Sequence, residues 1–252
     1  MWAIVTGASS GIGRAAAKRL AAGGYQVLAV GRDAEALEMV CREIAEMGGR
    51  AEQWIGDVTL AAAPAEIVKR GNDLASSAGL DVLVNAAGII ASGGVGETSD
   101  EAWDVMFDIN VRAPFRLIRE ATPALTARRG TVVNVSSVAG LRSFPGLAAY
   151  CVSKAAVDQL TRCAALDLAP KGIRVNAVNP GVVVTNLHRR SGMEETRYAE
   201  FLERSKTTHP LGRPGTPEEI ADLIAFLASP SSGWVTGETI AIDGGRHLTC
   251  LR

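Results

Sequence analysis

The stretch "IVTGASSGIGRAAAKRLAAGG" (residues 4–24) decides the fold, because a glycine-rich turn there joins a short apolar run to a helical pattern. Two unrelated motifs fit this turn. Residues 7–11, "GASSG", match the G-x-S-x-G of a serine hydrolase, in which Ser9 would be the nucleophile. Extended to Gly13, the same residues match a strand-to-helix turn that binds a nucleotide diphosphate.

The position of the turn favours the nucleotide interpretation, because a hydrolase elbow normally follows several strands and this turn follows the first apolar run. Each glycine also has a role. Gly7 lets the chain turn off the strand, Gly11 lets the backbone approach a pyrophosphate, and Gly13 permits close contact between helix and strand. N–H groups at a helix start favour an anion, so we expect further cofactor contacts at Ser9, Ser10 and Ile12. The serine hydrolase remains an alternative.

Composition narrows the class of protein. The 252 residues are 47% hydrophobic and 21% charged, which is typical of a globular domain with a sizeable core. The formal charge of −1, without a basic block, argues against nucleic acid as a partner. We see no signal peptide and no apolar run long enough to span a membrane, so we expect a cytoplasmic location. The scattered Cys41, Cys151, Cys163 and Cys250 indicate reduced thiols, with no metal site.

Short apolar runs alternate with longer helical patterns along the chain. Strands are predicted at 2–6, 26–31, 51–58, 80–88, 130–137, 173–181 and 238–243. Helices are predicted at 12–22, 34–47, 62–77, 100–127, 150–169 and 216–229, with a bend or break in the fourth at Pro114 or Pro123. This alternation indicates βαβ units and a parallel sheet covered on both faces. We predict one α/β domain, residues 1–252, with a doubly wound, Rossmann-type sheet of about seven strands.

Eight motifs then follow one another in a fixed order. They are "TGASSGIG" (6–13), "DV" (57–58), "NAAG" (85–88), Asn110 in "DINVRAPF", "NVSSVAG" (134–140), "YCVSK" (150–154), "NPGVVVT" (179–185) and "IDGG" (242–245). In this order they resemble the short-chain dehydrogenase/reductase family over nearly the whole chain, and look closest to its 3-oxoacyl-ACP reductases. The resemblance implies a strand order of 3-2-1-4-5-6-7, a nicotinamide cofactor and a homotetramer.

Tyr150 and Lys154 are the expected centre of the chemistry. Reduction of a ketone by hydride needs an acid that gives a proton to the developing alkoxide. The two residues are four apart, so a helix places them on one face. A nearby ammonium, together with the positive nicotinamide of the oxidised cofactor, is expected to lower the tyrosine pKa from about 10. We predict Tyr150 as the general acid/base, and the resemblance implies that Lys154 also binds the nicotinamide ribose.

Ser137 and Asn110 complete the expected catalytic set. Ser137 ends the fifth predicted strand, at the edge where open α/β sheets bind ligands, and can donate to the substrate oxygen. Ser136 is the alternative, since strand alternation lets only one of the two face the site, and the spacing of the family favours Ser137. Asn110 matches the asparagine that in the family holds a water for proton relay to the lysine. Alternatively, Asn110 caps a break in the helix.

The end of the second strand bears on the choice of cofactor. Gly31 stands where NAD-preferring relatives have aspartate, and Arg32 after it can pair with a 2′-phosphate, so we favour NADP(H) over NAD(H). Asp33 would oppose this if the turn were shifted, and Ser10 stands where many NADP-dependent members have a basic residue. Three further sets of cofactor contacts are expected. Asp57 and Val58 would flank the adenine, and Asn85, Ala86 and Gly88 would contact the middle of the cofactor. The carboxamide would be oriented by Pro180, Gly181, Val183 and Thr185.

The substrate is expected to be a small ketone or secondary alcohol, with a 3-oxoacyl thioester as a narrower possibility. Its pocket is expected from 138–149 and 182–208, with 186–210 as a substrate loop. The expected wall is apolar beside Ser137 and Tyr150, and consists of Leu141, Leu147, Val182 and Leu187. Phe144 is a further candidate, and Met193, Tyr198 and Phe201 line this pocket or pack helices.

The sequence also bears on the oligomeric state. The helix at 150–169 is apolar over most of its circumference, which predicts that a second subunit covers it. A cofactor-binding regulator that has lost catalysis remains the alternative to the enzyme.

Overall fold

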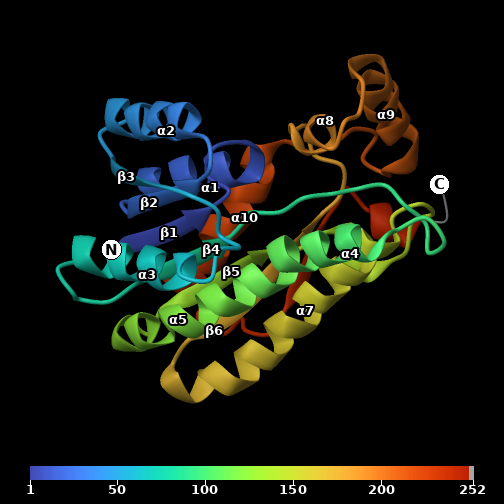
Figure 1. Ribbon diagram of the computed structural model, residues 1–252. Helices are drawn as coiled ribbons and strands as arrows, with labels where there is room; N and C mark the ends of the chain where they lie inside the picture. Colours follow the sequence, from blue (N-terminus) through green and yellow to red (C-terminus); the bar gives the residue numbers. More distant parts are fainter. Residues whose placement is uncertain (250–252) are drawn as a thin grey trace.

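A seven-stranded parallel sheet forms the centre of the molecule in the computed structural model, which describes residues 1–249 (Figure 1). The strands are β1 (Trp2–Thr6), β2 (Gln26–Gly31), β3 (Arg50–Ile55), β4 (Val82–Asn85), β5 (Thr131–Val135), β6 (Arg174–Pro180) and β7 (Thr239–Ile242). Their order across the sheet is β3-β2-β1-β4-β5-β6-β7, and every neighbouring pair is parallel. The predicted fold class and strand order are therefore confirmed.

Helices cover both faces of this sheet. The helices α1 (Gly11–Ala22), α2 (Ala34–Glu46) and α10 (Pro217–Ala228) lie on one face, and α3 (Ala63–Leu74), α5 (Ala113–Arg128) and α7 (Ala148–Leu168) lie on the other (Figure 1). In β1, Ala3 and Val5 pack against the first set, whereas Trp2 and Ile4 pack against the second. Successive residues of a strand point to opposite faces, so a sheet covered on both sides needs strands that are apolar throughout.

The long helix predicted at 100–127 breaks, as expected, but at a π turn. α4 (Asp100–Phe107) passes through the π turn η1 (Asp108–Arg112) into α5. Pro114 lacks the N–H that would bond to the Asn110 carbonyl, so regular α-helical bonding cannot continue through this point. The helix instead forms one wider, π-type turn, in which the Ala113 N–H donates to the Asp108 carbonyl five residues back. Pro123 stays inside α5 without ending it.

Two helices lie outside the layers that cover the sheet. α8 (Leu187–Arg190) and α9 (Glu195–Thr208) occupy the segment expected as a substrate loop, and Figure 1 shows them away from the sheet. The remaining short elements are α6 (Val138–Leu141), η2 (Ala169–Lys171), η3 (Pro230–Ser232) and η4 (Arg246–Leu248). The third and fourth strands are shorter than predicted, because residues 56–58 and 86–88 belong to the loops that follow them.

Two further observations concern the described residues. Cys41, Cys151 and Cys163 are free thiols, while Cys250 lies outside residues 1–249. Within the same range, the helices are too short or too polar to cross a lipid bilayer.

Candidate active site

A cleft of about 1220 Å³ opens at the carboxyl ends of β1, β4, β5 and β6. The strand order reverses between β1 and β4, and open α/β sheets bind ligands at such a switch point. Single ligand pockets commonly measure roughly 300–1,000 Å³, so this cleft has room for a cofactor and a substrate together.

Glycines shape the part of the cleft that follows β1. Gly7 has φ +66°, and a Cβ there would lie 2.8 Å from the Ala86 carbonyl oxygen. A Cβ on Gly13 would overlap the Gly7 carbonyl, and Gly11 has φ +53°. A side chain at any of these positions would be strained or would push the loops apart.

The start of α1 fits an anion. Ser10 is the N-cap residue, but its side chain makes no capping hydrogen bond, and the first turn contains no acidic residue. By contrast, the Asp33 carboxylate caps α2 by accepting a bond from the Ala36 N–H at 3.0 Å. Free N–H groups at a helix N-terminus bind phosphate oxygens, and residues 10–13 line the cleft, so this turn fits the pyrophosphate of a dinucleotide.

Residues at the end of β2 lie where the adenosine ribose of a nicotinamide cofactor is expected. The Arg32 side chain is 68% exposed, lines the cleft and lies 4.0 Å from the Asp57 carboxylate. Asp33 is outside the cleft wall, because its carboxylate is used in the cap of α2.

The structure brings most of the predicted site residues to one cleft. Those in its wall are Gly7, Ser10, Gly11, Ile12, Gly13, Arg32, Ala86, Gly88, Ser137, Leu147, Tyr150, Lys154, Pro180, Gly181, Val182, Val183, Thr185 and Leu187. Phe144 and Phe201 also line the cleft, whereas the buried Tyr198 packs α9 by donating to the Thr185 carbonyl at 2.9 Å.

Six predicted residues lie outside the wall: Ser9, Asp57, Val58, Asn85, Asn110 and Leu141. Asn85 donates to the Asn134 side chain at 2.9 Å inside the protein, and Val58 packs in the core. Leu141 is exposed on α6. Asp57 accepts bonds from the backbone N–H and the hydroxyl of Thr59 at 2.9 and 2.7 Å. Contacts of these residues with a ligand stay predictions.

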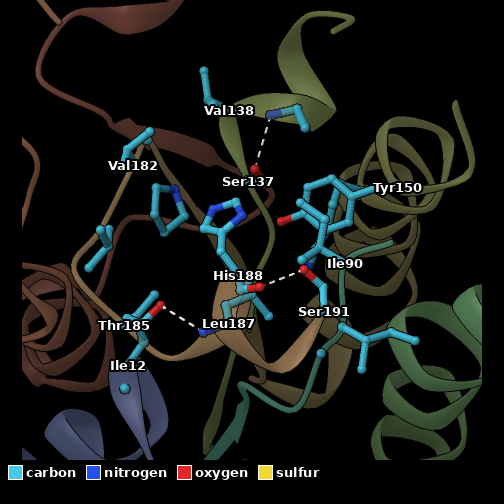
Figure 2. A pocket seen from close by; sticks show the side chains of 18 of the residues that line it. Ile12, Ile90, Ser137, Val138, Tyr150, Val182, Thr185, Leu187, His188 and Ser191 are labelled. Carbon is cyan, nitrogen blue, oxygen red and sulfur yellow. Dashed lines mark hydrogen bonds between the residues drawn. The ribbon is translucent and has the colours of Figure 1, made fainter. Parts of the chain in front are cut away.

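Tyr150 and Ser137 point into the middle of the cleft, where His188 faces them (Figure 2). The Ser137 hydroxyl oxygen accepts a bond from the Ala139 N–H at 3.1 Å, so the hydroxyl hydrogen is available to another acceptor. Burial raises the pKa of Tyr150 to about 12, and the hydrogen bond with Ser137 opposes this rise. We expected a lowered tyrosine pKa. In the protein alone, desolvation of the phenol outweighs the hydrogen bond with Ser137.

Lys154 lies one helical turn beyond Tyr150, with its Nζ 5.8 Å from the centre of the phenol ring. The Nζ donates to the Val135 carbonyl at the end of β5, at 2.9 Å. Burial lowers the pKa of the amine to about 8, and the charge of Asp158 opposes this effect. Lys154 is therefore mostly protonated at neutral pH.

Ser136 lies in the cleft wall, whereas Asn110 lies just outside it. The Ser136 hydroxyl donates to the Lys154 carbonyl at 3.1 Å and so ties α7 to β5, which leaves Ser137 as the serine that faces Tyr150. The buried Asn110 accepts from the Ile89 N–H at 3.0 Å and donates to the Ser153 hydroxyl at 3.0 Å. A Cβ on Gly88 would lie 3.3 Å from Asn110 Oδ1 and 3.5 Å from Lys154 Nζ, so Asn110 adjoins the lysine. Its relay water stays a prediction.

Asp158 lies on α7 outside the cleft wall and bonds to residues that hold the site in place. Sequence reasoning did not predict this role. The two carboxylate oxygens of Asp158 accept from the Asn179 amide at 3.1 and 2.9 Å, and the same amide donates to the Ser137 carbonyl at 2.9 Å. Asp158 is 2% exposed, and burial raises its pKa. Its position four residues after Lys154 was the available signal, because it places both on one helix face. The partner Asn179 lies too far along the chain to be found this way.

The histidines do not support the hydrolase alternative, which requires one beside Ser9. The His209 ring accepts from the Val182 N–H at 3.1 Å, and the His247 ring contacts Asp243 at 2.9 Å. The His188 ring packs against Phe201 with the ring centres 4.5 Å apart.

The fold and the cleft define a Rossmann-type, dinucleotide-binding oxidoreductase. Comparison with known proteins agrees. The family model described as enoyl-(acyl carrier protein) reductase matches residues 7–247. The chain thus belongs to the short-chain dehydrogenase/reductase family and resembles its 3-oxoacyl-ACP reductases.

The relatives are similar over nearly their whole length. The 3-oxoacyl-[acyl-carrier-protein] reductase FabG of Staphylococcus aureus is 39% identical over 249 residues, which cover 98% of each chain. A 3beta-hydroxysteroid dehydrogenase of Mediterraneibacter gnavus is 40% identical, covering 96% of this chain and 93% of its own. A putative NAD(P)-dependent gluconate 5-dehydrogenase of Beutenbergia cavernae, solved with bound NADP, has a TM-score of 0.88 and 37% identity, covering 98% and 97%. The chain is an NAD(P)-dependent oxidoreductase that acts on CH–OH or C=O groups.

Proposed function

We propose that the chain reduces a ketone with NADPH, or oxidises the corresponding secondary alcohol with NADP+, and that Tyr150 is the general acid/base. One observation carries this proposal: the Tyr150 and Ser137 side chains face the cleft that the glycine turn of α1 also lines. A carbonyl compound held at the two hydroxyls would share that cleft with a dinucleotide bound at α1.

The chain's own residues supply the proton chemistry, while the bound nicotinamide supplies or accepts the hydride. The Ser137 hydroxyl donates to the carbonyl oxygen, since its oxygen already accepts from Ala139. The raised pKa of Tyr150 keeps the phenol protonated until negative charge develops on that oxygen, and the phenol then passes its proton to it. The Lys154 ammonium stabilises the phenolate that remains.

The relatives support the reaction more firmly than any one substrate. Proteins named for a 3-oxoacyl carrier substrate, a 3beta-hydroxysteroid and 2-(S)-hydroxypropyl-CoM are all 37–40% identical to this chain. Each name describes a secondary alcohol or its ketone. A 3-oxoacyl thioester stays the narrower proposal, and apolar side chains at Phe144, Leu147, Val182 and Leu187 line the cleft for it.

Replacing Tyr150 by Phe tests the proton donor. We expect kcat for reduction of a ketone panel that includes acetoacetyl-coenzyme A to fall by roughly 10²–10⁴-fold, because the phenol proton is removed while the ring remains. The measurement is NADPH oxidation followed by absorbance, with NADPH binding checked by fluorescence. Tyr25→Phe is the control, since the Tyr25 hydroxyl donates to the Ala228 carbonyl at 3.2 Å, outside the cleft wall. Wild-type turnover in Tyr150→Phe would contradict the proposed role.

NADP(H) as the preferred cofactor rests on the end of β2. Arg32 lines the cleft and can bond a 2′-phosphate, while the carboxylate of Asp33 is held in the cap of α2 and Gly31 has no side chain to oppose the phosphate. The Beutenbergia cavernae protein, described as NAD(P)-dependent, was solved with NADP bound at low occupancy, which is compatible with this choice.

Arg32→Gln tests this preference. We expect KM for NADPH to rise roughly 10-fold or more, because a charge-assisted hydrogen bond to the phosphate is lost, with little change in KM for NADH. Arg42→Gln, an exposed arginine of α2 outside the cleft wall, should leave both values unchanged. Equal rises for the two cofactors, or a wild-type preference for NADH, would contradict the proposal.

We also propose a homotetramer in the cytoplasm. The apolar side chains of Val152 and Leu166 on α7 are 47% and 79% exposed, and Trp103 of α4 is 37% exposed, which favours cover by other subunits. Light scattering after size-exclusion chromatography should give about four times the 26.3 kDa of one chain. A mass of one chain would contradict the tetramer.

A further inference from the structure

Five arginines besides Arg32 line the cleft. Arg142 follows α6, Arg190 ends α8, Arg197 and Arg204 lie on α9, and Arg246 begins η4; all five side chains line the cleft that contains Tyr150.

Arg142 lies away from the adenosine side of the cleft. Arg32 follows β2, on one side of the switch between β1 and β4, whereas Arg142 follows β5 and α6 on the other side. The phosphates expected at α1 and Arg32 therefore do not explain Arg142.

α9 turns one face toward the cleft. Its cleft-lining residues are Arg197, Phe201, Arg204, Ser205 and Thr208. Arg197 and Arg204 are seven residues apart, which is two helical turns, so both project from the same face. An amphipathic surface helix normally directs its charges to solvent, and here two of them are directed into a ligand site.

The described part of the cleft wall contains no aspartate or glutamate. Neighbouring arginines outside the wall do have carboxylate partners: Arg189 pairs with Glu195 and Arg213 with Glu219. Within residues 1–249, Arg142, Arg190 and Arg197 form no ion pair with a carboxylate within 4.0 Å. The positive charge of the wall is thus not balanced by acids in the wall itself.

Arg246 shows that the cations are close enough to repel one another. Its side chain is buried, and burial together with the charges of Arg142 and Arg204 lowers its pKa, while Asp243 opposes the effect. The guanidinium carbons of Arg142 and Arg246 each lie 5.4 Å from the centre of the Phe144 ring. Arg142 donates to the carbonyls of Arg246 and Thr249, and Arg246 donates to the Thr208 carbonyl at 3.3 Å. These bonds hold the two side chains in the wall, whereas Arg190 and Arg197 are exposed to the cleft.

We propose that the substrate end of the cleft binds an anionic group of the substrate, and that the enzyme prefers small ketones bearing a carboxylate over their neutral analogues. The inference rests on the proposed function and narrows its substrate class. Guanidinium groups form short, charge-assisted hydrogen bonds with carboxylates, and the arginines would hold the acid while Ser137 and Tyr150 receive the ketone oxygen.

The test compares matched acids and esters on the full-length enzyme with NADPH. Acetoacetate, 4-oxopentanoate and 5-oxohexanoate are each paired with their methyl ester, because the series varies the distance between ketone and carboxylate. We expect kcat/KM for at least one acid to exceed that of its ester by roughly 10- to 100-fold, the range for a hydrogen bond to a charged group.

The double variant Arg190→Gln/Arg197→Gln identifies the groups responsible. Both side chains are exposed, so their replacement does not disturb the core. We expect the acid-to-ester ratio to fall at least 10-fold, whereas Arg162→Gln, an exposed arginine of α7 outside the cleft wall, keeps the ratio. Titration calorimetry of each acid against the NADP+ complex should show weaker binding in the double variant, whether or not the acid turns over.

Three results would overturn the inference. Esters reduced as fast as their acids throughout the series would show that the site has no preference for an anion, although the ketone reductase function would stand. An unchanged acid-to-ester ratio, accompanied by a higher KM for NADPH in the double variant, would assign the arginines to the cofactor. Calorimetric binding of the acids that is absent, or equal in the two proteins, would remove the anion site even if no ketone of the series were reduced.

Discussion

Burial of Tyr150 and Lys154 on one face of α7, against the end of β5, is the constraint on which the site depends. Desolvation raises the pKa of the phenol to about 12 and lowers that of the amine to about 8, so burial shifts both groups toward their neutral forms while the amine stays mostly protonated at neutral pH. The amine is held by the Val135 carbonyl and the phenol by Ser137. The phenol therefore becomes charged only when it gives its proton to the developing alkoxide, as a general acid should.

Buried hydrogen bonds between the surrounding elements keep Tyr150 and Lys154 in place. Asp158, Asn179 and Ser137 form one chain that joins α7, β6 and the end of β5. The π turn places Asn110 where its amide holds the backbone of Ile89, beside Gly88 and the lysine. The parallel sheet brings these loops to one edge, because all seven strands end in the same direction.

Local sequence signals predicted the parallel α/β sheet, the glycine turn and the Tyr150–Lys154 pair, because each depends on patterns within one element or one turn. The strand order and the choice of Ser137 over Ser136 followed from the resemblance to the short-chain dehydrogenase/reductase family. The features that were missed depend on contacts between distant segments. The role of Asp33 as the cap of α2, the partner of Asp158 and the gathering of Arg142, Arg197 and Arg246 in one wall appear only after folding. The raised pKa of Tyr150 in the protein without cofactor was also not foreseen, because depth of burial cannot be read from helical spacing.

The most direct test of this account is an ultraviolet difference titration of the Tyr150 phenol, obtained by subtracting Tyr150→Phe from wild type with and without NADP+. Without cofactor, the account predicts no Tyr150 phenolate at pH values up to about 10, the ordinary pKa of tyrosine. With NADP+ bound, the phenolate should form at lower pH, because the positive ring adds to the charge of Lys154. Half-formed phenolate at pH about 10 or below in the free enzyme, or no shift on binding NADP+, would contradict it.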